Sequence, residues 1–278
     1  MVDSHGLDFS RIEHLLNPDA LSDVHVTIVG LGSGGAPACD HLCMAGVRRW
    51  ALFDRDDLEP VNLVKHPRMR RDIGRPKVEI QKEWILDRNP AAEVSVRKED
   101  VLTSDNFSET LASTSLVLSC PDTRGVREFI SDKCVQARVP FVVGSVFRTG
   151  FGGEVYGYIP GETGCFHCLE AFSEANGLNV GDVDIENTEE EQEQIYGLGN
   201  VGFQASGLSM DIQMISLIQA RMALSILAKR NRFKAPTMKA NWIVFGNRPF
   251  KGIFERHFEA QQMRLRPQAS CPSCGIEP

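Results

Sequence analysis

The chain has 278 residues, of which 42% are hydrophobic and 24% charged, and its formal net charge is −7. These values fit an α/β protein with a sizeable core, and they exclude the strongly basic surface typical of nucleic-acid-binding proteins. The first residues lack the basic and apolar regions of a secretory signal. We therefore expect a cytoplasmic protein without a nucleic-acid partner.

The first half of the chain predicts a strand, a helix and a second strand. An apolar run at 26–29 leads into a glycine turn and a helical apolar pattern, and the next strand ends at Asp54. A helix opened by Pro76 is expected over 74–89. Further strands are expected at 113–120, 139–147, 152–160 and 241–246. Together these elements predict an α/β fold with a doubly wound, Rossmann-like, mostly parallel sheet and helices on both faces.

The second half contains an acidic stretch and a long apolar stretch. Residues 182–194 carry mostly acidic side chains, so we expect a loop at about 173–200. Residues 207–229 are apolar but include Asp211 and Arg221, which a lipid-facing helix carries only at high cost. This pattern predicts a core helix and no membrane span. We find no clean boundary, and expect a single domain, with a nucleotide-binding half at 22–160 and the remaining elements at 161–278.

Three glycines, Gly30, Gly32 and Gly35, match the G-x-G-x-x-G dinucleotide fingerprint. Such glycines let the backbone turn tightly and approach a phosphate, while the following helix start offers N–H donors. Asp54, at the end of the next strand, is placed to accept hydrogen bonds from a ribose. By itself this pattern fits NAD as well as ATP, and it also fits a turn needed only for close packing.

Downstream side chains favour ATP over NAD. Asn62, Lys65 and Lys77 follow the expected ribose carboxylate, and Asp122 follows the apolar strand 113–120. Breaking a triphosphate requires cations against the phosphate oxygens, and a carboxylate at a strand end is placed to hold Mg²⁺. Alternatively, each lysine, like most of the basic residues at 65–77, is a solvated surface charge, and Asp122 is the N-cap of a following helix.

Two C-x-x-C pairs stand about a hundred residues apart: Cys165 with Cys168, and Cys271 with Cys274. Four thiolates form a closed tetrahedral site, which is typical of structural zinc. Two separate redox pairs are the alternative. A zinc ion would tie the C-terminal part of the chain to its middle.

The order of these motifs, from about Arg11 to Gly275, resembles the ThiF/MoeB/HesA family, the relatives of ubiquitin-activating enzyme. The resemblance implies ATP-dependent adenylation of the C-terminal glycine of a small ubiquitin-like or sulfur-carrier protein, giving an acyl-adenylate and pyrophosphate. It also implies Mg²⁺, structural Zn²⁺ and a homodimer. The "NLVKHP" segment favours bacterial members associated with conjugation systems over the molybdopterin branch.

The resemblance assigns roles by position. Cofactor-binding residues would be Gly30, Gly32, Ser33, Gly35, Asp54, Asn62, Lys65, Lys77, Asp122 and Thr123. Lys77, Asp122 and Arg11 would serve catalysis, with Arg11 reaching the ATP of the dimer partner. The four cysteines of the two C-x-x-C pairs match the zinc ligands of the family.

Two positions depart from the family pattern. Lys65 stands where arginine is usual, so a bidentate phosphate contact becomes a point charge. No cysteine lies between Cys168 and Cys271, where thioester-forming members carry one. Either the chain stops at the adenylate, or the accepting thiol belongs to another protein, such as a conjugating-enzyme-like partner. Two further hypotheses are a non-catalytic ATP-binding partner subunit and an NAD-dependent oxidoreductase.

Overall fold

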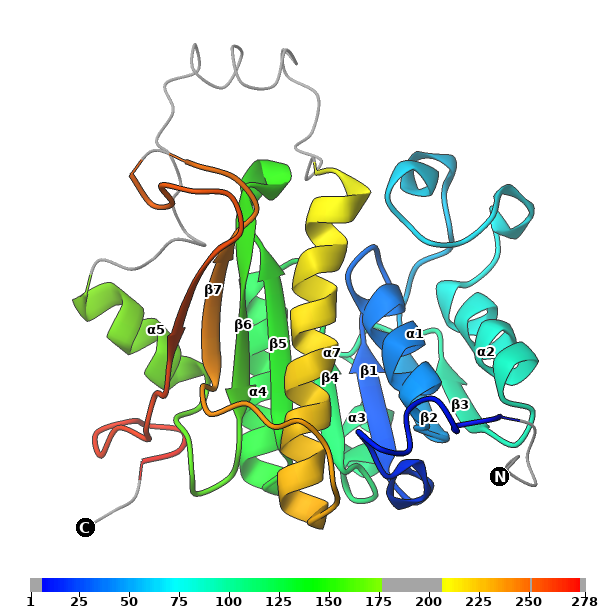
Figure 1. The fold of residues 1–278 in the computed structure, drawn as a ribbon, viewed down its shortest axis with the longest axis horizontal. Helices are drawn as coiled ribbons and strands as arrows, with labels where there is room; N and C mark the ends of the chain where they lie inside the picture. Colours follow the sequence, from blue (N-terminus) through cyan, green and yellow to red (C-terminus); the bar gives the residue numbers. More distant parts are fainter. Residues whose placement is uncertain (1–6, 177–206, 251, 276–278) are drawn as a thin grey trace.

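The computed structural model describes residues 7–176, 207–250 and 252–275, and these fold around one eight-stranded sheet (Figure 1). The strand order is β3-β2-β1-β4-β5-β6-β7-β8. The strands are β1 (His25–Val29), β2 (Arg49–Phe53), β3 (Glu93–Arg97), β4 (Leu116–Ser119), β5 (Phe141–Val146), β6 (Gly152–Tyr158), β7 (Trp242–Gly246) and β8 (Glu259–Met263).

Strands β3, β2, β1, β4 and β5 pair in parallel, whereas β6, β7 and β8 extend the sheet in antiparallel fashion. From β1 the chain proceeds first to β2 on one side and later to β4 on the other. The strand order therefore reverses at β1, and the crevice at the carboxyl ends of β1 and β4 is where doubly wound sheets bind ligands. The predicted mostly parallel sheet is confirmed.

Helices cover both faces of the sheet. One apolar core joins β1 through Val26 and Ile28 to α1 (Gly35–Ala45), α2 (Lys77–Arg88) and α7 (Ser209–Asn231). The other core lies between the opposite face and α3 (Asp105–Leu111), α4 (Arg124–Ala137) and α5 (Phe166–Ala175). Because successive strand residues point to opposite faces, Ile28 enters the first core and Val29 the second.

Helix α7 lies along the sheet between α1 and β5 and is a core helix, as predicted (Figure 1). By length and composition it is also the one described helix that could cross a membrane, but half of its apolar window is buried inside the protein. Its buried Gln219 donates to the backbone carbonyls of Ser119 and Val142, at 3.1 Å each. These contacts attach the helix to the ends of β4 and the start of β5.

The described residues differ from the sequence prediction at helices α3 and α5, which were not predicted, at the loop expected from about 173, and at two strands. The loop predicted from about 173 begins too early, because α5 continues to Ala175; the acidic stretch 182–194 lies outside the described residues. Strands β3 and β8 were not predicted. They are the two edges of the sheet, and their many polar residues obscure the apolar signal of a buried strand.

Candidate nucleotide-binding site and cysteine cluster

The glycine turn joins the end of β1 to the start of α1. Gly30 has φ +90°, and a Cβ there would lie 2.8 Å from the carbonyl oxygen of Cys120. A Cβ on Gly35 would collide with the carbonyl of Gly30, whereas no atom lies within 4 Å of the corresponding point on Gly32. The first and third glycines therefore permit the fold, while the second leaves room for a ligand beside the backbone.

Asp54 holds this turn directly. One of its carboxylate oxygens accepts the backbone N–H of Leu31 at 2.6 Å, and the other accepts the N–H of Asp56 at 2.8 Å. Burial raises the pKa of Asp54, and the nearby Lys77 ammonium opposes that shift. The structure thus brings the predicted ribose carboxylate to the glycine turn, and shows that both of its oxygens already bind backbone donors.

Lys77 is the first residue of α2, and its side chain lies against Asp56, which follows β2. Its side chain is only 9% exposed, and its Nζ lies 2.9 Å from Oδ2 of Asp56. The backbone N–H of Lys77 also donates to the carbonyl of Asp56 at 3.1 Å. A buried ammonium requires such a partner, and the pairing with Asp56 orients Lys77. Asp56 was not among the residues predicted from the sequence, although it follows Asp54 by two positions in "DRDD".

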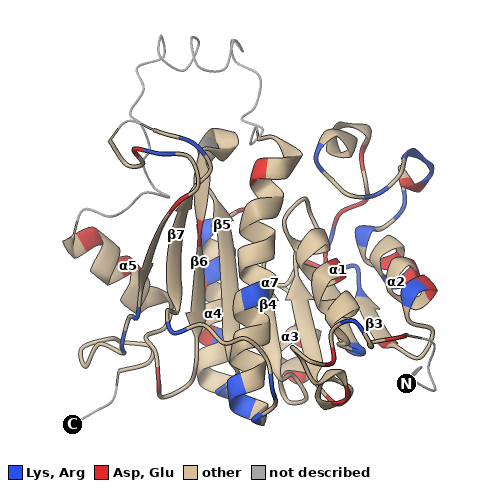
Figure 2. Ribbon diagram, viewed as in Figure 1, with Lys and Arg blue, Asp and Glu red and all other residues tan. Residues whose placement is uncertain are grey.

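Asn62 and Lys65 lie in the loop between β2 and α2, where basic and acidic positions are interspersed (Figure 2). Oδ1 of Asn62 accepts the N–H of Glu59 at 2.9 Å and completes a capping box on the short helix η2 (Pro60–Val64). The carbonyl of Lys65 accepts the hydroxyl of Ser209, at the start of α7, at 3.3 Å. Ser33 is half-buried in the turn. Nucleotide contacts of Ser33, Asn62 and Lys65 stay predictions.

Asp122 approaches the same turn from β4. Cys120 and Pro121 contact Gly30, and Asp122 and Thr123 follow them as exposed residues. The N-cap of α4 is Thr123, so the alternative that Asp122 caps this helix is wrong. An exposed carboxylate at this strand end fits the donor chemistry of Mg²⁺, which prefers oxygen ligands. Lys77 thus lies near Asp54 at the glycine turn, and Asp122 directly follows the residues that pack against Gly30.

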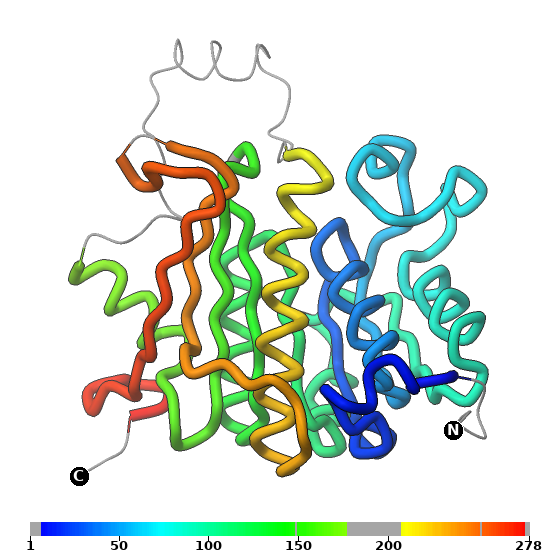
Figure 3. The backbone as a smooth tube through the Cα atoms, viewed as in Figure 1, coloured from blue at the N-terminus to red at the C-terminus, as the bar shows by residue number. Residues whose placement is uncertain are grey.

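Arg11 lies elsewhere in the fold. Its segment packs at the carboxyl end of α1, where Phe9 comes within 3.5 Å of the Cβ position of Gly46, the C-cap residue. Arg11 is exposed, and this end of α1 is opposite the glycine turn (Figure 3). Arg11 is thus not part of the site in its own chain, and its role across a dimer stays a prediction.

Comparison with known proteins identifies the family. The sequence model of the ThiF family matches residues 6–272. The chain belongs to the ThiF family. Sulfur carrier protein ThiS adenylyltransferase of Escherichia coli K12 is 33% identical over 54% of this chain and 59% of its own length. Molybdopterin-synthase adenylyltransferase of Salmonella typhimurium is 31% identical over 65% of this chain and 70% of its own length.

A further relative, ubiquitin-like modifier-activating enzyme 5 of Branchiostoma floridae, is 28% identical over 59% of this chain and 43% of its own. The crystal structure of Escherichia coli MccB with MccA-N7isoASN has a TM-score of 0.69 and 20% identity, covering 93% of this chain and 69% of that one. These findings confirm the family resemblance and the fold, and the relatives' names agree with the predicted class of enzyme.

In this ThiF-family chain Arg68, one of the basic residues interpreted as solvated, is instead part of a buried polar group. Arg68 donates to both oxygens of Asp40, at 2.6 and 3.0 Å, and to Oε1 of Gln81 at 2.6 Å. Gln81 in turn donates to Asp40 at 2.9 Å, and all three side chains are buried. Asp40 lies on α1 and Gln81 on α2, so Arg68 links both helices to the loop that precedes Lys77.

The sulfur atoms of the four cysteines in the two C-x-x-C pairs lie close together. Sulfur atoms of Cys165 and Cys271, and of Cys168 and Cys274, lie 3.5 Å apart, and all four fall within 4.8 Å of one another. Two Zn–S bonds of about 2.3 Å at a tetrahedral angle separate sulfurs by about 3.8 Å, so the cluster fits zinc. The pKa of Cys168 is lowered to about 5, chiefly because the Cys165 thiol donates to its sulfur.

The cluster unites distant parts of the chain. The backbone N–H of Cys165 points to the sulfur of Cys274, and that of Gln268 to the sulfur of Cys168, at 3.4 Å each. Backbone donors of this kind stabilise thiolates. The segment at 271–274 thus lies against the start of α5. The geometry supports the predicted structural site, and none of the four cysteines forms a disulfide bond.

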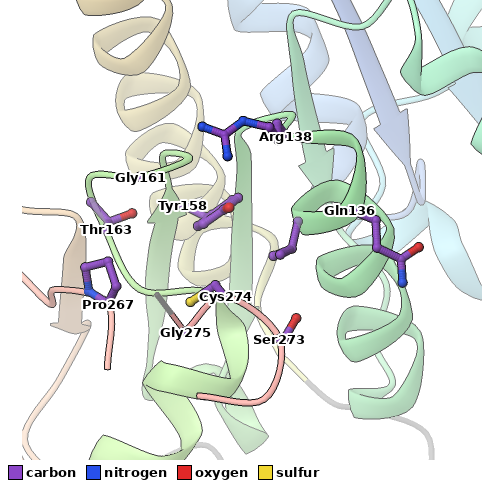
Figure 4. A pocket seen from close by; sticks show the side chains of 10 residues that line it. Gln136, Arg138, Tyr158, Gly161, Thr163, Pro267, Ser273, Cys274 and Gly275 are labelled. Carbon is purple, nitrogen blue, oxygen red and sulfur yellow. The ribbon is translucent and has the colours of Figure 1, made fainter. Parts of the chain in front are cut away.

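A cavity of about 470 Å³ borders this cluster (Figure 4). Its lining includes Arg138, Tyr158, Thr163 and Cys274. Tyr158 pairs with Phe141, the first residue of β5, so the cavity lies toward the amino end of the parallel strands. It is therefore separate from the glycine turn, which stands at their carboxyl end.

Proposed function

We propose that this chain uses ATP and Mg²⁺ to adenylate the C-terminal glycine of a small ubiquitin-like or sulfur-carrier protein. The observation that carries the proposal is a glycine turn at the reversal of strand order, with Asp54 bound to it, Lys77 near Asp54, and the segment leading to Asp122 packed against it. The names of the relatives, which include a ThiS adenylyltransferase and a molybdopterin-synthase adenylyltransferase, support the same reaction.

In the proposed step, a carboxylate oxygen of the carrier attacks the α-phosphorus of ATP, and the bond to the leaving pyrophosphate breaks. The α-carboxyl group, with a pKa of about 3.5, is already ionised at neutral pH, so the reaction needs no general base. Rate then comes from positioning and from charge stabilisation. Asp122 would hold Mg²⁺, which neutralises charge on the phosphates when bound.

Lys77 would serve the phosphates from a buried, fixed position. Its ammonium is held by Asp56 before the nucleotide arrives, and few side-chain conformations remain to be lost on binding. Lys65 would add a second positive charge from the end of η2. The turn supplies backbone amides at the start of α1, where the helix dipole favours an anion.

The proposal predicts exchange of labelled pyrophosphate into ATP only when a carrier ending in glycine is present. Lys77→Met and Asp122→Asn should each lower the exchange rate by about 100-fold or more, the scale found when one charge-stabilising group is removed from an active site. Lys98→Met is the matched control, because Lys98 also pairs with a neighbouring aspartate, Asp57, but on the exposed surface. It should retain wild-type exchange.

The same experiments separate the competing hypotheses. Wild-type protein that binds ATP but supports no exchange with its carrier would be the non-catalytic partner subunit, and stabilisation by NAD in place of ATP would identify an oxidoreductase. After adenylation, a thiol for any thioester step would come from a partner, since the chain has no cysteine between Cys168 and Cys271. A conjugating-enzyme-like protein would supply it.

The homodimer and the role of Arg11 belong to the same proposal. Arg11→Ala and Lys77→Met should each be inactive alone if Arg11 serves the ATP of the partner subunit. Mixing the two variants should then restore part of the exchange, because one site of the mixed dimer contains both native residues. Light scattering measures the dimer, and a monomer with full activity would refute this part of the proposal.

A further inference from the structure

His66 contacts the centre of the glycine turn, although no role was predicted for it from the sequence. Its imidazole is buried, and Nε2 lies 2.8 Å from the carbonyl oxygen of Leu31. Leu31 stands between Gly30 and Gly32, and its N–H is the one bound by Asp54 at 2.6 Å. The backbone N–H and the backbone carbonyl of Leu31 are therefore both bound by side chains from the segment that follows β2.

This contact fixes the orientation of the next backbone donor. The carbonyl of Leu31 and the N–H of Gly32 belong to one peptide unit, and in a planar trans peptide they point in opposite directions. Because His66 draws the carbonyl toward itself, the N–H of Gly32 must point away from His66. Gly32 is also the glycine with no atom within 4 Å of its Cβ position. The donor thus lies at the part of the turn that a ligand can approach.

We propose that His66 is a positioning residue for nucleotide binding: its Nε2–H holds the Leu31 carbonyl, so that the Gly32 N–H faces a bound phosphate group. The inference rests on the proposed function, because it assumes that the turn binds ATP. It assigns to His66 an action through the backbone, with no contact to the nucleotide.

The surroundings of His66 favour the neutral ring. The pKa of His66 is lowered to about 4, mainly by burial; the Leu31 carbonyl opposes this effect, the cations Arg68 and Lys77 add to it, and Asp40 opposes it more weakly. A carbonyl oxygen only accepts, so Nε2 carries the proton and Nδ1 does not. Within the described part of the chain, Nδ1 is buried with no hydrogen-bond partner. His66 therefore acts as a neutral donor, unlike its cationic neighbour Lys65.

The test compares side chains that keep or remove this donor. His66→Gln places an amide N–H where Nε2 stands, whereas His66→Phe keeps the ring and loses the donor. His41→Phe, at an exposed position of α1, is the matched control. Loss of one such hydrogen bond should weaken ATP binding about 2- to 10-fold in His66→Phe. His66→Gln and His41→Phe should stay within about twofold of wild type.

Calorimetry with ATP alone gives the dissociation constants, and thermal unfolding without nucleotide reports on the fold. In the exchange assay, His66→Phe should raise the KM for ATP and leave the KM for the carrier unchanged. If His66→Phe does not fold, His66→Asn replaces it, because the shorter amide cannot reach the Leu31 carbonyl. The same contrast with His66→Gln is then expected.

Equal ATP affinity of wild type and His66→Phe (or His66→Asn) overturns the inference, even when the variant has a lower Tm, because the role is then only structural. That outcome leaves the proposed function intact. Wild-type protein that fails to bind ATP refutes the proposed function instead, and removes the role of His66 with it. Wild-type protein that binds ATP but supports no exchange refutes only the adenylation step.

Discussion

Arg68→Met tests whether the buried group of Arg68, Asp40 and Gln81 supports the loop that carries the site. The substitution keeps an apolar chain of similar length and removes the guanidinium, which donates to Asp40 at 2.6 and 3.0 Å and to Gln81 at 2.6 Å. Asp40 then keeps one donor, the Gln81 amide at 2.9 Å, but loses its counter-charge. The side chains of Arg68 and Asp40 are 5% and 12% exposed, so water compensates little.

Removing one partner of a buried ion pair costs about 3–5 kcal/mol, and the remaining Gln81 bond places Arg68→Met near 3 kcal/mol. Whole domains unfold with about 5–15 kcal/mol, so this loss is a large part of the total. Replacing the whole group with apolar residues, in Asp40→Leu with Arg68→Met and Gln81→Met, leaves none of the three side chains with an unpaired polar atom. Such replacements are often neutral or stabilising, so the triple variant should be more stable than Arg68→Met alone.

Urea unfolding followed by tryptophan fluorescence measures both variants, because Trp84 lies against the guanidinium of Arg68, whose Cζ is 5.1 Å from its ring centre. The expected result is a lower midpoint for Arg68→Met and a recovery in the triple variant. A loss below about 1 kcal/mol for Arg68→Met, or a triple variant at least as unstable, would show that burial of this pair contributes little to the fold. Exposed Arg70→Met is the control.

Three further predictions concern the cluster, a histidine and a helix end. The purified protein should contain one zinc per chain, and either a chelator or Cys271→Ser should lower its Tm. A zinc content near zero, together with an unchanged Tm on chelation, would contradict the structural site. Stability should fall from pH 6.5 toward 4, because the unfolded chain protonates His66 first: the ordinary pKa of histidine is 6.5, and burial lowers it to about 4 in the fold. The difference corresponds to about 3 kcal/mol, and His66→Gln should lose this dependence in pH-dependent urea titrations. Arg232→Gly should stabilise by about 0.5–1 kcal/mol in thermal unfolding, because this exposed C-cap of α7 has φ 55°, and a decrease in Tm would exclude strain there.

The sequence predicted the sheet wherever strands are buried on both faces. β1, β4 and β5 are short apolar runs between turn residues, and a run of this kind is recognisable without a partner. β3 and β8 were missed because an edge strand needs apolar residues on one face at most. In β8 the side chains of Ala260, Gln261 and Gln262 are exposed, and only pairing with β7 makes the segment a strand.

The site was predictable as a set of residues but not as a set of contacts. Spacing placed Asp54 and Lys77 on either side of a long loop, and only the folded loop shows that Asp56 joins them. From the charge pattern, the basic residues at 65–77 were interpreted as solvated, because most arginines are exposed at the protein surface. Arg68 is an exception and is buried. Its partners, Asp40 and Gln81, lie on two different helices, and no local sequence pattern connects them.

The polar groups at the turn are largely paired before any nucleotide arrives. Asp54 binds two backbone N–H groups, His66 binds a carbonyl, and Lys77 binds Asp56. If ATP binds as proposed, the turn needs no rearrangement to receive it, and the contact that must change is the one at Lys77. Asp56 and a phosphate are alternative anions for the same buried ammonium. A triphosphate can compensate Lys77 through several charged oxygens, which adenosine lacks, so selection for phosphorylated ligands follows from this one ion pair.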